Sequence, residues 1–217
     1  MSSQIARSNM IAQQLRTNEV LDPSILDLFN TIPREAFVPT AYRAVAYSDL
    51  QIELAHHQRM LTPTEEGKIL QALALQGHEL VLEIGTGTGY FTALLSRLCK
   101  QVISVDYFSD FTNQARQKLQ ENSCENVTLV TGDASHGWLD KAPYDVIIFT
   151  GAIDELTETI RLQLMPRGKL FAIIGSGVVM QGQYHTLDTN GTWSKKIVFE
   201  TNIPALIDPT RPNQFVF

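Results

Sequence analysis

Five short apolar runs in the second half of the chain constrain its fold more than any other feature. They cover residues 80–85, 102–106, 127–132, 146–151 and 169–175. Amphipathic stretches at 90–99, 111–122 and 155–164, which we expect to be helices, lie between successive runs. Strands that are apolar throughout and alternate with helices predict a parallel sheet covered on both faces.

The end of this region breaks the alternation. Two strand-like stretches, 183–189 and 192–201, flank Asn190-Gly191, which is a strong signal for a tight hairpin. The chain is therefore expected to be an α/β protein with a Rossmann-like, doubly wound and mostly parallel sheet that ends in an antiparallel edge.

Helical patterns dominate the first third of the chain. We expect helices over residues 4–16, after Pro23, and from Pro63 to about Leu75. Together they predict a helical N-terminal cap. We expect a single domain, with the cap at 1–78, an α/β core at 79–175, and a hairpin and tail at 176–217.

Composition excludes several classes of protein. The 217 residues have a formal net charge of −6 and contain no Lys/Arg block, which argues against a nucleic-acid partner bound through a broad basic face. Two cysteines, no signal peptide and no apolar run of ~18 residues predict a soluble, cytoplasmic protein without a membrane partner. No metal-ligand spacing occurs, so we expect no metal site, and the adjacent His56 and His57 are interpreted as a solvated loop pair.

A glycine-rich loop follows the first apolar run. Residues 83–90 read E-I-G-T-G-T-G-Y and lead directly into a helix. Glycines at such a place let the backbone turn sharply and approach a ligand at the carboxyl edge of the sheet. A dinucleotide fingerprint would need glycine at position 90, which is Tyr90. The pattern instead resembles motif I of the class I S-adenosylmethionine-dependent methyltransferases.

Two strand-end acids support a nucleoside cofactor. Asp106 ends the second run about twenty residues beyond the glycine loop, where an acid can accept hydrogen bonds from both ribose hydroxyls. Asp133 follows the third run and is either a turn aspartate or an acid facing the adenine amino group. The predicted cofactor-binding residues are Gln58, Glu83, Gly85, Thr86, Gly87, Gly89, Asp106, Tyr107, Asp133 and Ala134.

Motifs along nearly the whole chain resemble those of the protein-L-isoaspartate O-methyltransferases. They are I-P-R-E-A-F-V-P at 32–39, A-Y-S-D at 46–49, V-L-E-I-G-T-G-T-G-Y at 81–90, G-D-A at 132–134 and P-Y-D-V-I-I at 143–148. The resemblance implies S-adenosylmethionine as cofactor. It also implies isoaspartyl residues of damaged proteins or peptides as substrate, methylated on their α-carboxyl group.

The segment before the third helix departs from this family. The family pattern G-Q-T-I-S-x-P is replaced by His57-Gln58-Arg59-Met60-Leu61-Thr62-Pro63, so Leu61 stands at the serine position. A leucine cannot donate a hydrogen bond to a carboxylate. Thr62 begins a T-x-x-E capping box, which commits its hydroxyl to the helix start. We therefore take Arg59, Leu61 and Thr62 as the candidate catalytic residues and expect weak or absent isoaspartyl methylation.

Three functions remain open on the sequence. The first is an isoaspartyl methyltransferase with a rebuilt acceptor pocket. The second is a methyltransferase acting on another acceptor, and the third is a non-catalytic regulatory protein that binds S-adenosylmethionine. The glycine loop and Asp106 favour cofactor binding in all three, and only the acceptor segment separates them. The extent of the resemblance places the first function ahead.

Overall fold

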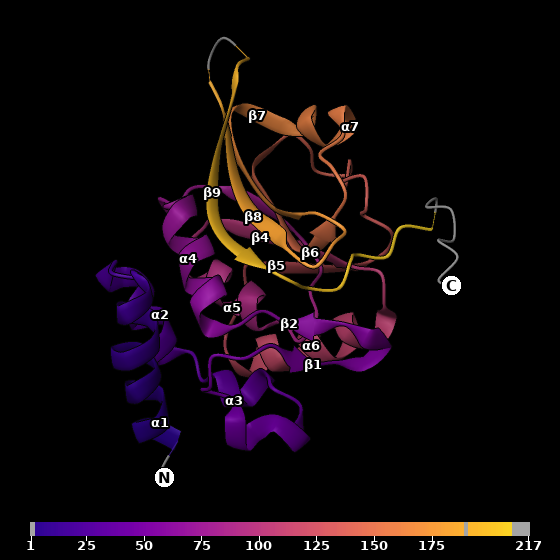
Figure 1. The fold of residues 1–217 in the computed structure, drawn as a ribbon. Helices are drawn as coiled ribbons and strands as arrows, with labels where there is room; N and C mark the ends of the chain where they lie inside the picture. Colours follow the sequence, from indigo (N-terminus) through magenta and orange to yellow (C-terminus); the bar gives the residue numbers. More distant parts are fainter. Residues whose placement is uncertain (1–2, 189–190, 210–217) are drawn as a thin grey trace.

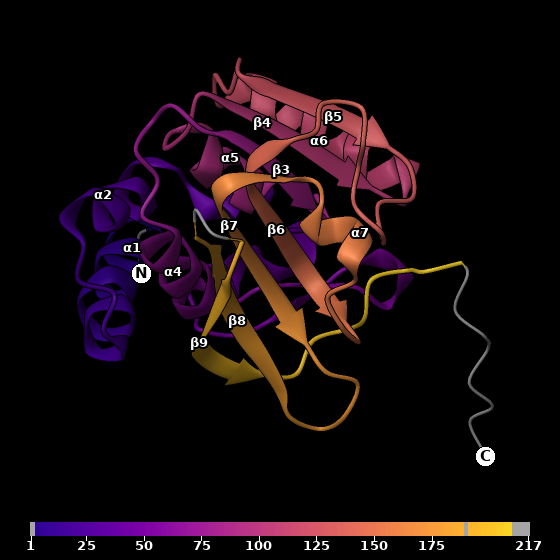
Figure 2. The same ribbon diagram turned by 90° about the horizontal axis from the view of Figure 1, so that it is seen from above.

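The computed structural model describes residues 3–188 and 191–209, and a seven-stranded sheet forms its centre (Figures 1 and 2). The strand order is β5-β4-β3-β6-β7-β8-β9. The strands are β3 (Leu80–Ile84), β4 (Gln101–Asp106), β5 (Val127–Thr131), β6 (Tyr144–Ile153), β7 (Leu164–Ile174), β8 (Met180–Leu187) and β9 (Trp193–Thr201). All five predicted apolar runs are therefore strands of one sheet.

The pairing confirms the predicted mixed sheet. β3 lies at the point where the strand order reverses and pairs in parallel with both β4 and β6. β8 and β9 add antiparallel strands beyond β7. Gly191 has φ 80° in the predicted hairpin turn, whereas Asn190 lies outside the described residues.

Side chains of alternating strand positions form two cores, one on each face of the sheet. On one face, Val81, Val102 and Ile148 pack with helices of the N-terminal region and with α5 (Tyr90–Ser96) and α6 (Ser109–Glu121). On the other face, Leu82 and Ile103 pack with Trp138 and with α7 (Glu158–Arg161). Both faces are covered, as continuous apolar strands require.

The predicted N-terminal cap is present. The helix expected over 4–16 is α1 (Ser3–Met10), continued by a π-helical turn, Ile11–Leu15, and a 3-10 turn, Arg16–Asn18. The cap also contains α2 (Pro23–Thr31), α3 (Arg34–Phe37), a 3-10 turn at Thr40–Val45 and α4 (Pro63–Leu73). Between them, a small sheet of β1 (Ile52–Glu53) and β2 (Arg59–Met60) flanks a 3-10 turn at Ala55–His57. α1 and α2 lie together beside α4 (Figures 1 and 2).

The start of α4 has the predicted capping box. Thr62 Oγ1 accepts a hydrogen bond from the Glu65 backbone N–H at 3.1 Å, and Glu65 Oε2 accepts from the Thr62 N–H at 2.7 Å. Pro63 occupies the first turn. These contacts fix the register of the segment that precedes the helix, which is the segment that departs from the family pattern.

One predicted helix is wrong in length. The helix expected over 155–164 is the single turn α7, because the chain leaves it to begin β7 at Leu164. Gln163 directs this exit: its backbone carbonyl accepts from the Tyr144 N–H at 2.8 Å, and its side chain accepts from the Trp138 N–H at 2.7 Å. An amide buried at 2% exposure with such partners overrides the local helical pattern.

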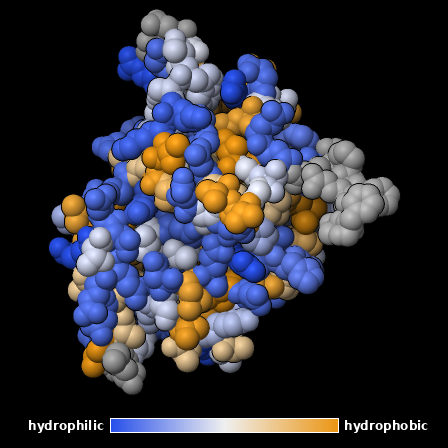
Figure 3. Space-filling model, in the orientation of Figure 1, coloured by the Kyte–Doolittle hydropathy of each residue, from blue (hydrophilic) through white to orange (hydrophobic). Residues whose placement is uncertain are grey.

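The surface carries no continuous apolar band on the face seen in Figure 3, where hydrophobic residues are scattered among hydrophilic ones. Across residues 3–188 and 191–209, no helix is long and apolar enough to cross a membrane.

Candidate active site

Two adjoining cavities open at the carboxyl edge of the parallel strands. The first encloses an empty volume of about 620 Å³, including its mouth, and the second about 340 Å³. Both cavities share Leu54, Arg59, Gly85, Gly87 and Thr150 as lining residues, so a molecule in one cavity would adjoin a molecule in the other.

The first cavity is built from strand ends that are distant in sequence. Its lining includes the glycine loop, the residues after β4 and β5, the end of β6, and the segment 203–207. That last segment runs beside β6: the Ala152 N–H donates to Pro204 O at 3.1 Å, and the Leu206 N–H donates to Ala152 O at 2.9 Å. The carboxyl edge of a parallel sheet, next to the point where strand order reverses, is where α/β folds bind ligands.

The glycine loop packs closely against two other segments, at Thr150 and at Ala115 of α6. Gly85 has φ 100°, and a Cβ on it would lie 2.3 Å from Thr150 Oγ1, which donates to Gly85 O at 2.6 Å. Gly89 has φ 82°, and a Cβ there would lie 2.9 Å from Ala115 Cβ on α6. Gly85 and Gly87 thus form the wall of both cavities, while Gly89 allows the helix contact.

Asp106 is a buried carboxylate at the wall of the first cavity. It is 7% exposed, and its Oδ2 accepts from the Gly87 N–H at 2.8 Å while its Oδ1 accepts from the Phe108 N–H at 2.9 Å. Burial raises the pKa of Asp106, against these two backbone hydrogen bonds. Each oxygen keeps further acceptor capacity. Tyr107 lines the same cavity beside it.

The predicted cofactor residues fall into three groups. Gln58, Gly85, Gly87, Asp106, Tyr107 and Ala134 line the first cavity, and Thr86 lines the second. Glu83, Gly89 and Asp133 line neither cavity. These three residues lie outside the linings of the two cavities, at the base of the glycine loop, at its end, and in the turn after β5.

Glu83 and Asp133 have structural partners instead. Glu83 has no exposed surface and accepts from Thr92 Oγ1 at 2.5 Å, and burial raises its pKa to about 8. It therefore joins the end of β3 to α5, the helix that follows the glycine loop. Asp133 is exposed, and its Oδ1 accepts from the Ser135 N–H at 2.9 Å and from Ser135 Oγ at 2.7 Å. It forms a turn that places Ala134 and Ser135 in the cavity lining.

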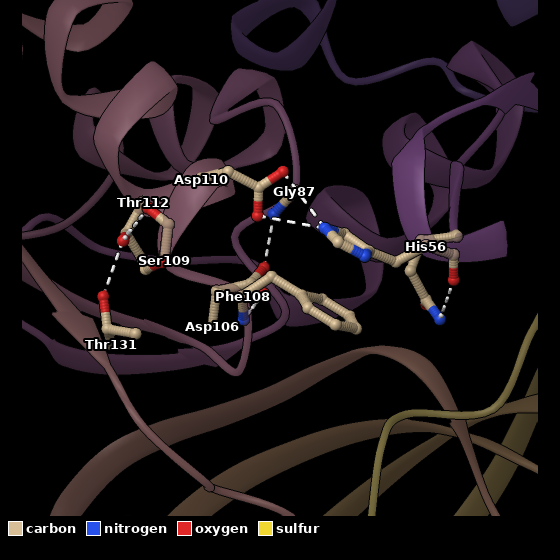
Figure 4. A network of polar contacts seen from close by, with 9 residues as sticks. His56, Gly87, Asp106, Phe108, Ser109, Asp110, Thr112 and Thr131 are labelled. Carbon is tan, nitrogen blue, oxygen red and sulfur yellow. Dashed lines mark hydrogen bonds and ion pairs between the residues drawn. The ribbon is translucent and has the colours of Figure 1, made fainter.

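His56 joins the cap to the cofactor side of the core (Figure 4). Its ring stacks on Phe108 with centroids 3.8 Å apart at 4°, and its Nε2 lies 3.1 Å from each carboxylate oxygen of Asp110. Both His56 and His57 have φ 56°, so the backbone turns tightly here. Both histidines are exposed in a loop, as the sequence predicts, and His56 in addition packs on Phe108. The sequence did not predict the contact between His56 and Asp110, because these residues lie 54 positions apart.

The three candidate catalytic residues lie near the second cavity but are not equivalent. Leu61 is 4% exposed and lines the cavity, and its carbonyl accepts from Arg34 Nη2 at 2.7 Å. Arg59 lines both cavities, with its Nη2 3.9 Å from Glu53 Oε1. Thr62 lines neither cavity, since its hydroxyl is committed to the capping box.

The second cavity also contains an acid that sequence reasoning missed. Glu66 is 2% exposed and forms an ion pair with Arg34, which is fully buried and whose guanidinium carbon lies 4.9 Å from the centre of the Tyr90 ring. Burial raises the pKa of Glu66 to about 7, although Arg34 opposes the shift. The T-x-x-E pattern identifies Glu65 as a capping residue, but nothing in it indicates a role for Glu66.

Comparisons with known proteins identify the fold and the family. The family model for "Protein-L-isoaspartate(D-aspartate) O-methyltransferase (PCMT)" matches residues 6–203. A protein-L-isoaspartate O-methyltransferase 2 of Pelobacter propionicus is 35% identical over 175 residues, covering 81% of this chain and 78% of its own length. A protein-L-isoaspartate O-methyltransferase of Myxococcus xanthus is 37% identical over 164 residues, covering 76% and 77%.

Solved structures agree with the fold. One protein-L-isoaspartate O-methyltransferase structure has a TM-score of 0.80 at 26% identity, covering 93% of this chain and 66% of that chain. A putative Plasmodium falciparum protein of the same description, solved with S-adenosyl-L-homocysteine, has a TM-score of 0.75 at 16% identity over 95% and 99%. The second likeness shows the fold alone.

The family match confirms the predicted resemblance, enzyme class and cofactor, and the solved structures confirm the predicted Rossmann-like fold. The protein is an S-adenosylmethionine-dependent O-methyltransferase. With a family match over nearly the whole chain, it belongs to the protein-L-isoaspartate(D-aspartate) O-methyltransferase family.

Proposed function

We propose that the protein methylates the α-carboxylate of isoaspartyl residues in proteins and peptides, with the cofactor in the first cavity and the acceptor in the second. The observation that carries this assignment is the wall shared by the two cavities at Gly85, Gly87 and Thr150. S-adenosylmethionine, when bound, supplies a methyl group on a positively charged sulfur. The shared wall is the place where that methyl group and an acceptor oxygen can meet.

The residues of the first cavity fit this cofactor. The positive φ of Gly85 and its close approach to Thr150 leave backbone rather than side chain facing the cavity. Asp106 offers two carboxylate oxygens to a pair of ribose hydroxyls, and Gly87 and Phe108 hold it in place. Tyr107, Phe108 and Phe111 supply the apolar surface that an adenine ring requires.

His56 is predicted to hold the strap formed by residues 54–58 over this cavity. Leu54 and Gln58 of the strap line the cavity, whereas His56 stacks on Phe108 and contacts Asp110. Replacing His56 by alanine is expected to weaken S-adenosylhomocysteine binding roughly two- to tenfold, since a stacked aromatic pair contributes about 0.5–1.5 kcal/mol. Calorimetry and the rate of ligand dissociation measure the effect.

The matched control for this change is His57→Ala. His57 is exposed and shares the same φ of 56°, so its replacement tests the backbone strain without removing the stack. An equal loss of affinity in both variants would show that the stack has no specific role in holding the strap.

The acceptor chemistry needs positioning rather than a strong base. An α-carboxyl group titrates near pH ~3.5 and is ionised at neutral pH. The site has to hold one carboxylate oxygen in line with the methyl group and exclude water. Leu61 offers no hydroxyl for this purpose, and Thr62 is committed to its helix. We therefore propose that isoaspartyl methylation by this protein is weak at neutral and higher pH.

Restoring the family serine tests this proposal. Leu61→Ser is expected to increase transfer to an isoaspartyl peptide roughly two- to tenfold at about pH 8, because one hydrogen bond contributes about 0.5–1.5 kcal/mol. The double change Arg59→Thr with Leu61→Ser tests whether Arg59 compensates. The matched control is Leu61→Ala, which shortens the side chain without adding a hydroxyl.

Two outcomes would contradict the role given to Leu61. One is robust wild-type transfer that Leu61→Ser leaves unchanged. The other is an equal gain from serine and alanine, which would mean that space, not hydrogen bonding, limits the acceptor. Radiolabel transfer to paired isoaspartyl and aspartyl peptides measures both.

A second candidate function is methyl transfer to a different acceptor. The observation in its favour is the lining of the second cavity, which includes the Glu66 carboxyl group and the apolar side chain of Leu61. At high pH, when Glu66 is ionised, this lining disfavours the binding of an anionic acceptor. Cofactor binding without transfer to either peptide at any pH would support this candidate, or the non-catalytic one, over the first.

The same proposal places the enzyme in the reducing cytoplasm, with proteins rather than nucleic acids or membranes as partners. Cys99 and Cys124 are both free and buried, which fits a reducing compartment. The acidic net charge of −6 argues against a polyanionic partner.

A further inference from the structure

A buried ion pair adjoins the second cavity: Glu66 lines the cavity, and its partner Arg34 lies behind it. Glu66 lies on the first turns of α4, and Arg34 reaches it from α3 while also donating to the Leu61 carbonyl at 2.7 Å. The guanidinium lies over the ring of Tyr90, which is 1% exposed and lines the same cavity. The Arg34–Glu66 pair therefore lies beside the acceptor segment, with Glu66 in the lining of the cavity and Arg34 behind it.

Several charged groups lie around Glu66, including the buried Glu83, whose pKa the Glu66 carboxylate helps to raise. Arg34 is its ion-pair partner, and Arg59 lines the same cavity. Glu65 and Asp49 add negative charge nearby and act with burial to raise the pKa of Glu66 to about 7. Both acids are occupied elsewhere: Glu65 accepts from the Thr62 N–H and from Thr201 Oγ1, and Asp49 Oδ1 accepts from the Thr64 N–H at 3.0 Å.

The protonation state of Glu66 decides what the cavity can accept. When Glu66 is ionised, it neutralises Arg34, and an acceptor carboxylate entering the cavity would face a like charge. Like charges in a poorly hydrated site cannot both ionise without a large cost. When Glu66 holds a proton, the charge of Arg34 is uncompensated and attracts the acceptor, and the carboxyl O–H becomes a hydrogen-bond donor.

We propose that Glu66, in its protonated form, is the acceptor-binding residue: it donates a hydrogen bond to the isoaspartyl carboxylate in place of the hydroxyl that Leu61 lacks. This inference rests on the proposed function and identifies the group at that site that binds the carboxylate. Sequence comparison on the segment 57–63 cannot locate it, because Glu66 lies beyond that segment.

The chemical step is balanced without any proton transfer. The acceptor oxygen forms a bond to the methyl carbon as the bond between that carbon and sulfur breaks. The carboxylate becomes a neutral methyl ester and the sulfonium becomes a neutral thioether. Glu66 keeps its proton throughout, so it positions the acceptor and does not act as a base.

Two measurements on the full chain test this assignment. The first is the pH dependence of kcat/KM for an isoaspartyl peptide, which reports groups that titrate in the free enzyme. We expect kcat/KM to fall about tenfold for each pH unit above the point at which Glu66 ionises. The second is calorimetric titration of the S-adenosylhomocysteine complex with the same peptide in two buffers of different ionisation enthalpy. We expect proton uptake on binding at about pH 8.

Wild type and two variants, Glu66→Gln and Glu66→Met, separate the possible roles of Glu66. Glu66→Gln keeps a donor and is expected to bind the peptide without proton uptake and to methylate it without the fall in kcat/KM that ionisation of Glu66 causes in wild type. Glu66→Met keeps the volume without the donor and is expected to lose peptide affinity about tenfold or more relative to Glu66→Gln. Circular dichroism and cofactor affinity confirm that each variant is folded.

The outcomes are distinct. Wild-type activity that rises with pH, together with loss of activity in Glu66→Gln, would make Glu66 a base and overturn the inference. Proton-free, pH-independent binding of the isoaspartyl peptide by wild type would also overturn the inference while leaving the proposed function intact. Binding of neither the isoaspartyl nor the aspartyl peptide by any of the three proteins would overturn the proposed function itself.

Discussion

Replacing Arg34 by methionine is expected to lower the free energy of unfolding by about 3–5 kcal/mol at about pH 8, since removing one partner of a buried ion pair leaves the other charge uncompensated. Arg34 has no exposed surface and contacts Glu66, the Leu61 carbonyl and the Tyr90 ring. Urea denaturation followed by circular dichroism measures the loss.

The pH dependence of this loss has a definite sign. Without Arg34, the pKa of Glu66 in the folded state rises further above its unfolded value. Between those two pKa values the folded protein binds more protons than the unfolded chain, so the stability of the variant falls as the pH rises. The loss relative to wild type is therefore expected to be smaller at about pH 5 than at about pH 8.

The control is Arg59→Met. Arg59 and Glu53 form a pair at 3.9 Å whose side chains are 42% and 69% exposed, so its removal is expected to cost only about 0–1 kcal/mol. Equal losses for Arg59→Met and Arg34→Met, or a loss for Arg34→Met that does not vary with pH, would contradict the account of the buried pair.

Replacing Asp106 by alanine is expected to weaken S-adenosylhomocysteine binding by roughly 10- to 100-fold, because a lost partner of a buried polar group costs about 1–3 kcal/mol. The carboxylate holds the Gly87 and Phe108 N–H groups, so its removal loosens the loop and also deletes the acceptor for the ribose hydroxyls. Isothermal titration calorimetry measures the affinity.

Asp133→Ala is the matched control for this change. Both aspartates follow strands at the same edge of the sheet, but Asp133 is exposed and lines neither cavity. Its replacement is expected to leave affinity within about twofold of wild type, as for a surface substitution. Similar losses in the two variants would show that Asp133 faces the cofactor, as the sequence alone allowed.

The strands and the glycine loop could be predicted because their signals are local. A run such as 80–84, apolar except for Glu83, is typical of a sheet covered on both faces, and the glycine spacing in 85–89 favours a sharp turn at its carboxyl end. The register of the α4 start was equally local, because Thr62, Pro63 and Glu65 form one capping box. The prediction of a long helix over 155–164 was wrong for the opposite reason. The end of α7 depends on contacts with Tyr144 and Trp138, which are distant in the sequence.

The candidate site was only partly predictable for the same physical reason. Gly85 and Asp106 follow from strand ends, but the partners of His56 and Glu66 come from other elements, 54 and 32 positions away. No local pattern states that Arg34 lies beneath Leu61, or that Glu83 faces Thr92 rather than the cavity. Such contacts depend on how the cap packs against the core, which the sequence pattern does not specify.

Methyl transfer to paired peptides, one with an isoaspartyl residue and one with an ordinary aspartyl residue, tests the central claim most directly. The account predicts transfer only to the isoaspartyl peptide, weak at about pH 8 and markedly stronger at about pH 6, where Glu66 holds its proton. Equal transfer to both peptides, or no transfer to the isoaspartyl peptide at either pH by a protein that binds the cofactor, would contradict it.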